Sequence, residues 1–134
     1  MKRAVLYADG AARGNPGPAG AGAALLDEEG RLVGEAMRYL AHATNNVAEY
    51  TALIIGLEEA QRLDVQDLDI RMDSKLVVEQ MNGKWKIKHP NLKPLAKQAG
   101  ALLASFPTRQ IRHVPREQNT IADALANRAI DEAR

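Results

Sequence analysis

Four carboxylates lie at positions where protein folds commonly place chemistry. Asp9 and Asp73 end segments with the pattern of buried strands, and Glu49 and Asp123 lie early in segments with helical periodicity. If the four converge, cations must offset their repulsion, and oxygen ligands without cysteine or paired histidine favour Mg²⁺ or Mn²⁺. Two such ions, roughly 4 Å apart, can activate a water and stabilise the leaving oxygen in phosphodiester cleavage.

The same positions also have purely structural explanations. The chain contains 17 Asp and Glu residues, so some fall at strand ends and helix starts by chance. Glu49 could simply be a favourable charge near a helix amino terminus. Asp73 could share a helix-start role with Ser74. Placement alone therefore leaves catalysis and structure as alternatives.

The elements that must position these carboxylates begin with three extended segments. Arg3–Asp9, Ala21–Leu26 and Arg31–Leu40 are expected to be strands, and residues 27–30 have the composition of a hairpin connection between the last two. The segment Gly10–Gly22 is rich in glycine and proline, which predicts a turn-rich loop. The first strand is therefore expected to end at Asp9.

The second half of the chain alternates helices with two further strands. The expected elements are a helix from Thr44 or Asn45 to about Leu63, a strand over Asp67–Asp73, a short helix from Ser74 to about Met81, a basic loop over Lys84–Pro90, a helix over Leu92–Ser105, a strand over Arg109–Val114 and a last helix from near Asn119. The order predicts an α/β fold with a five-stranded mixed sheet and helices on both faces. The ends of the first and fourth strands can then be neighbours.

Composition limits the class of protein. With 134 residues and 46% apolar content, the chain suits a single domain over residues 1–134 with a sizeable core. The absence of cysteine excludes a disulfide framework, a thiolate zinc site and a cysteine nucleophile. The longest apolar stretch, Ala19–Leu26, is far shorter than the roughly 20 residues that span a bilayer. We expect a cytoplasmic protein without a membrane partner.

The net charge of +1 hides a regional imbalance. From Asp27 to Asp69 there are ten acids and three arginines, whereas from Arg71 to Gly100 there are seven Lys or Arg and two acids. Trp85 lies among Lys84, Lys86 and Lys88 in the basic part, a combination suited to packing on a sugar while lysines approach phosphates. Solvated surface charge and a buried tryptophan are the alternatives.

Ordered sequence blocks resemble type 1 ribonuclease H over nearly the whole chain. They are Asp9-Gly10, Gly14-Asn15-Pro16-Gly17-Pro18, Thr44-Asn45-Asn46 with Glu49, Met72-Asp73-Ser74, and Asn119 with Asp123-Ala124-Leu125-Ala126. The resemblance implies the ribonuclease H-like fold and an endonuclease that hydrolyses the RNA strand of RNA–DNA hybrids, leaving 5′-phosphate and 3′-hydroxyl ends. The sequence shows no protein–protein interaction motif, so we expect a monomer without an obligate protein partner.

The resemblance also implies roles for individual residues. Asp9, Glu49, Asp73 and Asp123 match the catalytic carboxylates, which hold two Mg²⁺ or Mn²⁺ ions in the presence of substrate. The residues expected to contact substrate are Gly10, Asn15, Thr44, Asn45, Asn46, Ser74, Trp85, Arg116 and Asn119. Among them, Thr44 and Asn45 would help to hold a DNA phosphate, with plain helix capping as the alternative. Asn15 and Asn46 would read 2′-hydroxyls.

The sequence departs from many family members in two places. The region Asn82–Asn91 is too short for the basic protruding helix, so the chain corresponds to the compact form. The loop over residues 114–118 lacks the usual histidine, and Arg116 or Glu117 could substitute in part. His113 is expected to be a strand residue.

Two other functions remain open at this stage. One is a binding module of the same fold that holds hybrid or RNA without turnover. The other is a related nuclease that acts on DNA or double-stranded RNA.

Overall fold

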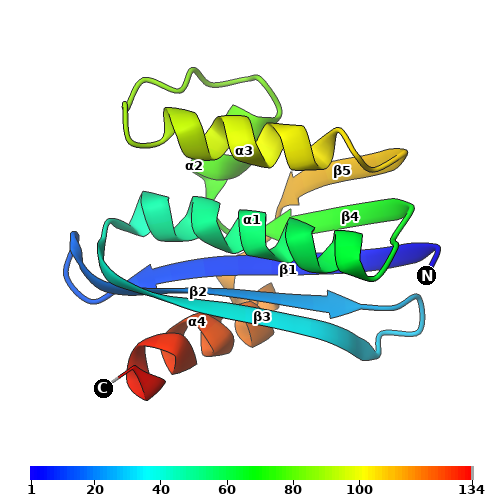
Figure 1. Ribbon diagram of the computed structural model, residues 1–134, viewed down its shortest axis with the longest axis horizontal. Coiled ribbons are helices and arrows are strands. Elements are labelled where there is room, and N and C mark those ends of the chain that lie inside the picture. Colours follow the sequence, from blue (N-terminus) through cyan, green and yellow to red (C-terminus); the bar gives the residue numbers. More distant parts are fainter. Residues whose placement is uncertain (134) are drawn as a thin grey trace.

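The computed structural model describes residues 1–133 and contains a five-stranded mixed sheet with the order β3-β2-β1-β4-β5 (Figure 1). The strands are β1 (Arg3–Ala12), β2 (Gly17–Leu26), β3 (Leu32–Ala43), β4 (Asp67–Met72) and β5 (Thr108–His113). β1, β2 and β3 pair antiparallel, whereas β4 pairs parallel with both β1 and β5. The expected α/β class and mixed sheet are confirmed.

Helices cover both faces of this sheet. Figure 1 shows α1 (Asn45–Arg62), α2 (Lys75–Met81) and α3 (Lys93–Leu103) on one side and α4 (Thr120–Glu132) on the other. The main core lies under α1, where Leu6 of β1 and Ile70 of β4 meet Leu53 and Leu57 of the helix, all of them fully buried. The alternation of apolar residues in β1 and β4 points every second side chain into this core.

The helix starts follow the expected capping chemistry. Thr44 caps α1, because its Oγ1 accepts from the backbone N of Val47 at 3.2 Å. Ser74 caps α2 in the same way, with Oγ accepting from the backbone N of Val77 at 3.4 Å. No helix within residues 1–133 is long and apolar enough to cross a membrane.

The predicted loop over Gly10–Gly22 is wrong for most of its length. β1 continues to Ala12 and β2 begins at Gly17, so the turn is confined to residues 13–16. Glycine serves close packing here: a Cβ on Gly20 would lie 2.0 Å from the carbonyl oxygen of Ala126 in α4, and one on Gly22 would lie 2.5 Å from that of Ala122. The β2 backbone and the α4 backbone are therefore in direct contact.

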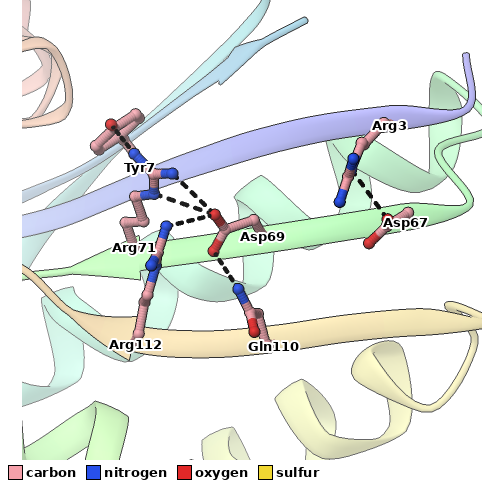
Figure 2. Close-up of polar contacts among 7 residues, drawn as sticks. All are labelled: Arg3, Tyr7, Asp67, Asp69, Arg71, Gln110 and Arg112. Atoms are coloured by element: carbon pink, nitrogen blue, oxygen red, sulfur yellow. Dashed lines mark hydrogen bonds and ion pairs between the residues drawn. The ribbon is translucent and has the colours of Figure 1, made fainter. Parts of the chain in front are cut away.

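The side of β4 and β5 that faces away from the main core is polar (Figure 2). Asp69 accepts from Arg71 and Arg112, each at 2.9 Å, and Arg71 donates to the hydroxyl of Tyr7 on β1 at 2.8 Å. Arg3 pairs with Asp67 at the far end of the same strands. Ion pairs at solvent-accessible positions contribute little to stability, so this network adds little to the stability that the core provides.

Candidate active site

Strand register brings Asp9 and Asp73 together. β4 pairs with β1 up to Met72 opposite Ala8, so the next residues, Asp73 and Asp9, follow at the same level. Asp9 lies inside β1 rather than at its end, because β1 continues to pair with β2 after β4 has ended. Its side chain is 4% exposed. The expected meeting of the first and fourth strands is confirmed, and the expectation that Asp9 ends its strand is wrong.

A close helix-to-strand contact supplies Glu49. A Cβ on Gly10 would lie 2.3 Å from the backbone carbon of Ala48, so only glycine lets α1 come this near to β1. The Gly10 backbone N–H then donates to Glu49 Oε1 at 2.5 Å. Carboxylate oxygens of Asp9, Glu49 and Asp73 all lie within 4.8 Å of one another, which is a geometry able to hold a metal ion.

Asp123 lies in the first turn of α4 and lines the same cleft, which has a volume of about 260 Å³. Arg116 and Asn45 also line this cleft. Asp123 lies close enough to Asp9 for a side-chain hydrogen bond, although it does not belong to the group of three carboxylates whose oxygens lie within 4.8 Å of one another. The structure thus brings all four predicted carboxylates to one cleft, three of them within 4.8 Å of one another and the fourth beside Asp9.

Burial and mutual repulsion shift the acid–base behaviour of the cluster. Burial, followed by the charges of Glu49 and Asp73, raises the pKa of Asp9 to about 10. Burial likewise raises the pKa of Glu49 to about 8, although the hydrogen bond from the Gly10 backbone opposes that change. Such a site favours any hard cation that relieves the repulsion, and its carboxylate oxygens are the ligands that Mg²⁺ and Mn²⁺ prefer.

Two asparagines donate hydrogen bonds to residues of the acidic cleft. Asn119 is 1% exposed, and its Nδ2 donates to Asp73 Oδ1 at 3.0 Å and to the backbone O of Ala8 at 2.9 Å. Asn127, one helical turn after Asp123, donates to the backbone O of that residue at 3.0 Å. Sequence reasoning missed both contacts. The four-residue spacing between Asp123 and Asn127 on a helix could have predicted their contact. The contact between Asn119 and Asp73 joins distant segments, so no local pattern predicts it.

Several predicted substrate residues line a second groove of about 390 Å³. Asn15, Thr44 and Asn46 lie there with Lys86 and Lys88. Asn15 Oδ1 also accepts from the backbone N of Asn45 at 3.0 Å, which ties the turn between β1 and β2 to the start of α1. The groove therefore combines neutral polar side chains with lysines.

The remaining predicted substrate residues have clear structural positions. Trp85 is 45% exposed, which excludes the alternative that it belongs to the core. Ser74 caps α2, and the backbone N–H of Gly10 donates to Glu49. His113 ends β5, as expected.

Comparison with known proteins places the chain in a family. Residues 7–129 match the model of a family described as reverse transcriptase-like. A bifunctional protein of Mycobacterium tuberculosis is 49% identical over 132 residues, which cover 98% of this chain and 36% of that protein. The chain thus spans about a third of the length of this relative. The solved N-terminal RNase H domain of the same protein has a TM-score of 0.95, with 48% identity over 99% of this chain and 96% of that chain.

Two further relatives are named as ribonucleases H. Ribonuclease HI of Halobacterium salinarum is 46% identical over 98% of this chain and 66% of its own length. LC11-RNase H1 from compost, solved in complex with an RNA/DNA hybrid, has a TM-score of 0.92 and 43% identity, and the match covers 97% of this chain and 98% of that one. Between α2 and α3, residues 82–92 contain no protruding helix. The chain belongs to the type 1 ribonuclease H family, in the form without a basic protrusion.

Proposed function

We propose that this chain is an endonuclease that hydrolyses the RNA strand of RNA–DNA hybrids and leaves 5′-phosphate and 3′-hydroxyl ends. The observation that carries the proposal is the cluster of Asp9, Glu49 and Asp73, with oxygens within 4.8 Å of one another and Asp123 in the same cleft. The relative solved with an RNA/DNA hybrid, 43% identical to this chain, supports the choice of substrate.

The four carboxylates would hold two Mg²⁺ or Mn²⁺ ions when substrate is bound. Their fit to such ions rests on hard oxygen donors, strong burial of Asp9 and a repulsion that a cation relieves. Bound in this way, the ions would supply Lewis acidity and lower the pKa of a water. No covalent intermediate on the enzyme is required, which suits a chain without cysteine.

The protein's own residues would fix the geometry of this site. The Gly10 backbone N–H keeps one Glu49 oxygen in place, and Asn119 keeps Asp73 oriented from the buried side. Because Asn119 is 1% exposed, we assign it to positioning Asp73 rather than to direct contact with substrate. Arg116 faces the cleft in the region where many relatives carry a histidine, so we assign it to contact with the scissile region or with product.

The second groove would bind the hybrid away from the cut. Thr44 and Asn45, at the amino terminus of α1, would hold a DNA phosphate with help from backbone N–H groups. Asn15 and Asn46 would read 2′-hydroxyls. Trp85, exposed beside lysines, would pack on deoxyribose.

The test is cleavage of an end-labelled RNA–DNA hybrid in Mg²⁺, Mn²⁺ or EDTA, beside single-stranded RNA, double-stranded RNA and duplex DNA. We expect metal-dependent loss of the RNA strand in the hybrid alone, abolished in Asp9→Asn and Asp73→Asn. Asp64→Asn, at an exposed position after α1, is the matched control and should cleave normally. Hybrid binding without cleavage in either metal would favour the binding module, and cleavage of duplex DNA or double-stranded RNA would favour the related nuclease.

We also propose that the protein acts as a monomer in the cytoplasm without an obligate protein partner. Sedimentation with and without hybrid tests the first part. A concentration-dependent dimer would contradict it.

A further inference from the structure

A buried tyrosine connects the carboxylate-bearing helix to the basic loop over Lys84–Pro90. Tyr50 follows Glu49 in α1, is fully buried, and donates its hydroxyl to Gln80 Oε1 at 2.6 Å. Gln80, in α2, in turn donates its Nε2 to the backbone O of Lys86 at 3.2 Å. Two hydrogen bonds in series thus run from α1 through α2 to the loop.

The Tyr50 hydroxyl and the Lys86 carbonyl together hold the Gln80 amide in one orientation. The carbonyl can only accept, so it takes an amide N–H, and the amide oxygen is left to accept from the Tyr50 hydroxyl. Burial raises the pKa of Tyr50 to about 12, so the hydroxyl keeps its proton at the pH of any ordinary assay. Without that hydroxyl, the Gln80 amide would lose the partner that holds it from the α1 side, and the Lys86 carbonyl would remain.

The loop has few other anchors at this point. The backbone N–H groups of Lys84 and Trp85 donate to Glu79 O, and His89 O accepts from Leu92 and Lys93 farther along. Between these ends, in the part of the chain that the structure describes, the Gln80 contact is the hydrogen bond that reaches the backbone of residues 86–88. The half-buried Ile87 adds an apolar contact with the core.

The anchored residues face the groove that would bind the hybrid. Lys86, Lys88 and Gln80 line it together with Asn15 and Thr44. We propose that Tyr50 and Gln80 are positioning residues, which hold the basic loop so that Lys86 and Lys88 lie on the groove and meet a nucleic-acid backbone. The inference rests on the proposed function, because it assigns phosphates of the hybrid as the groups that these lysines meet.

The experiment compares Tyr50→Phe and Gln80→Met with the wild-type protein. Tyr7→Phe is the matched control, since it also removes a hydroxyl that takes part in a hydrogen bond, on the opposite side of the sheet (Figure 2). Hybrid Kd in EDTA is measured at several salt concentrations by fluorescence anisotropy, and KM and kcat are measured in Mg²⁺.

For both test variants we expect Kd and KM to rise about three- to tenfold, as for one lost hydrogen bond, while kcat stays within about twofold. The slope of log Kd against log salt concentration should become shallower by about 1, because fewer phosphates are neutralised. A purely structural role would leave that slope unchanged. In the double variant, the second change should add little to the first.

Unchanged KM and salt slope in folded Tyr50→Phe and Gln80→Met would overturn the inference, as would an equal effect in Tyr7→Phe. If Tyr50→Phe fails to fold, Gln80→Met decides alone. A wild-type protein that binds hybrid without cleaving it would refute the proposed function, yet the Kd and salt comparison would still test the positioning role. Absence of hybrid binding by the wild-type protein would refute both.

Discussion

Replacing Asp9 with asparagine should make the metal-free protein more stable while it abolishes turnover. In the folded state Asp9 lies buried between Glu49 and Asp73, and burial and these charges raise its pKa to about 10 from an ordinary value of 3.8. The folded protein therefore binds a proton at Asp9 more tightly than the unfolded chain does. The contribution of Asp9 to stability without metal is therefore fully present below about pH 4 and is lost as the pH rises towards 10.

The separations in the site set the size of this effect. At 4.8 Å, the upper limit within the cluster, two unit charges repel by about 3.5 kcal/mol at an effective dielectric constant of about 20. Uptake of a proton costs about 1.4 kcal/mol per pH unit above the ordinary pKa of 3.8, so protonation reduces the cost of this repulsion at pH 5 but not at pH 8. We expect Asp9→Asn to gain about 3 kcal/mol of unfolding free energy at pH 8 in EDTA, equivalent to a Tm about 10 °C higher.

Thermal and urea unfolding at pH 5 and pH 8, with EDTA or Mg²⁺, measure this gain. The advantage of Asp9→Asn should shrink at pH 5, where the wild-type site is more fully protonated. Mg²⁺ should stabilise the wild type more than the variant, because only the wild type keeps the full set of ligands. Asp64→Asn controls for removal of an exposed charge and should change stability by less than about 0.5 kcal/mol. An Asp9→Asn protein no more stable than the wild type at pH 8 in EDTA would refute the repulsion argument.

Other substitutions separate positioning from substrate contact. Asn119→Ala should lower kcat about tenfold or more with little change in KM and cost about 1–3 kcal/mol of stability, since it leaves the Ala8 carbonyl buried without its donor; a normal kcat in steady-state assays would remove its role at Asp73. Trp85→Ala should fold normally and raise KM more than it lowers kcat, and a largely unfolded variant by circular dichroism would contradict its exposed position. Asn15→Ala should reduce the preference for hybrid over DNA duplex in competition binding, and equal preference in variant and wild type would exclude that assignment.

The sequence predicted the order of elements because apolar periodicity is a local signal. Residue type and position predict Ser74 as one cap and either Thr44 or Asn45 as the other, and the structure has Thr44 and Ser74 accept the expected backbone hydrogen bonds. The convergence of Asp9 with Asp73 followed from strand order, since parallel neighbours end at the same edge of a sheet.

The errors have a common physical origin in contacts between distant segments. Gly20 and Gly22 look like turn residues because glycine is frequent in turns, yet here they admit the backbone of α4. The need for glycine at these positions comes from residues about 100 positions away, so the sequence near β2 does not reveal it. The Tyr50–Gln80 hydrogen bond, across 30 positions, was hidden for the same reason.

The two glycine contacts of β2 also determine how far the last helix can slide. Gly20 meets Ala126 and Gly22 meets Ala122, so two residues of strand correspond to four residues of helix, running in opposite directions. Two strand residues rise about 6.6 Å and four helical residues about 6 Å. The two backbones therefore have nearly the same spacing, and both glycine contacts form at once. A shift of α4 along its axis by a single residue would place side chains, not bare backbone, against the strand. The two contacts thereby fix the position of Asp123 along the sheet, where its side chain already reaches Asp9.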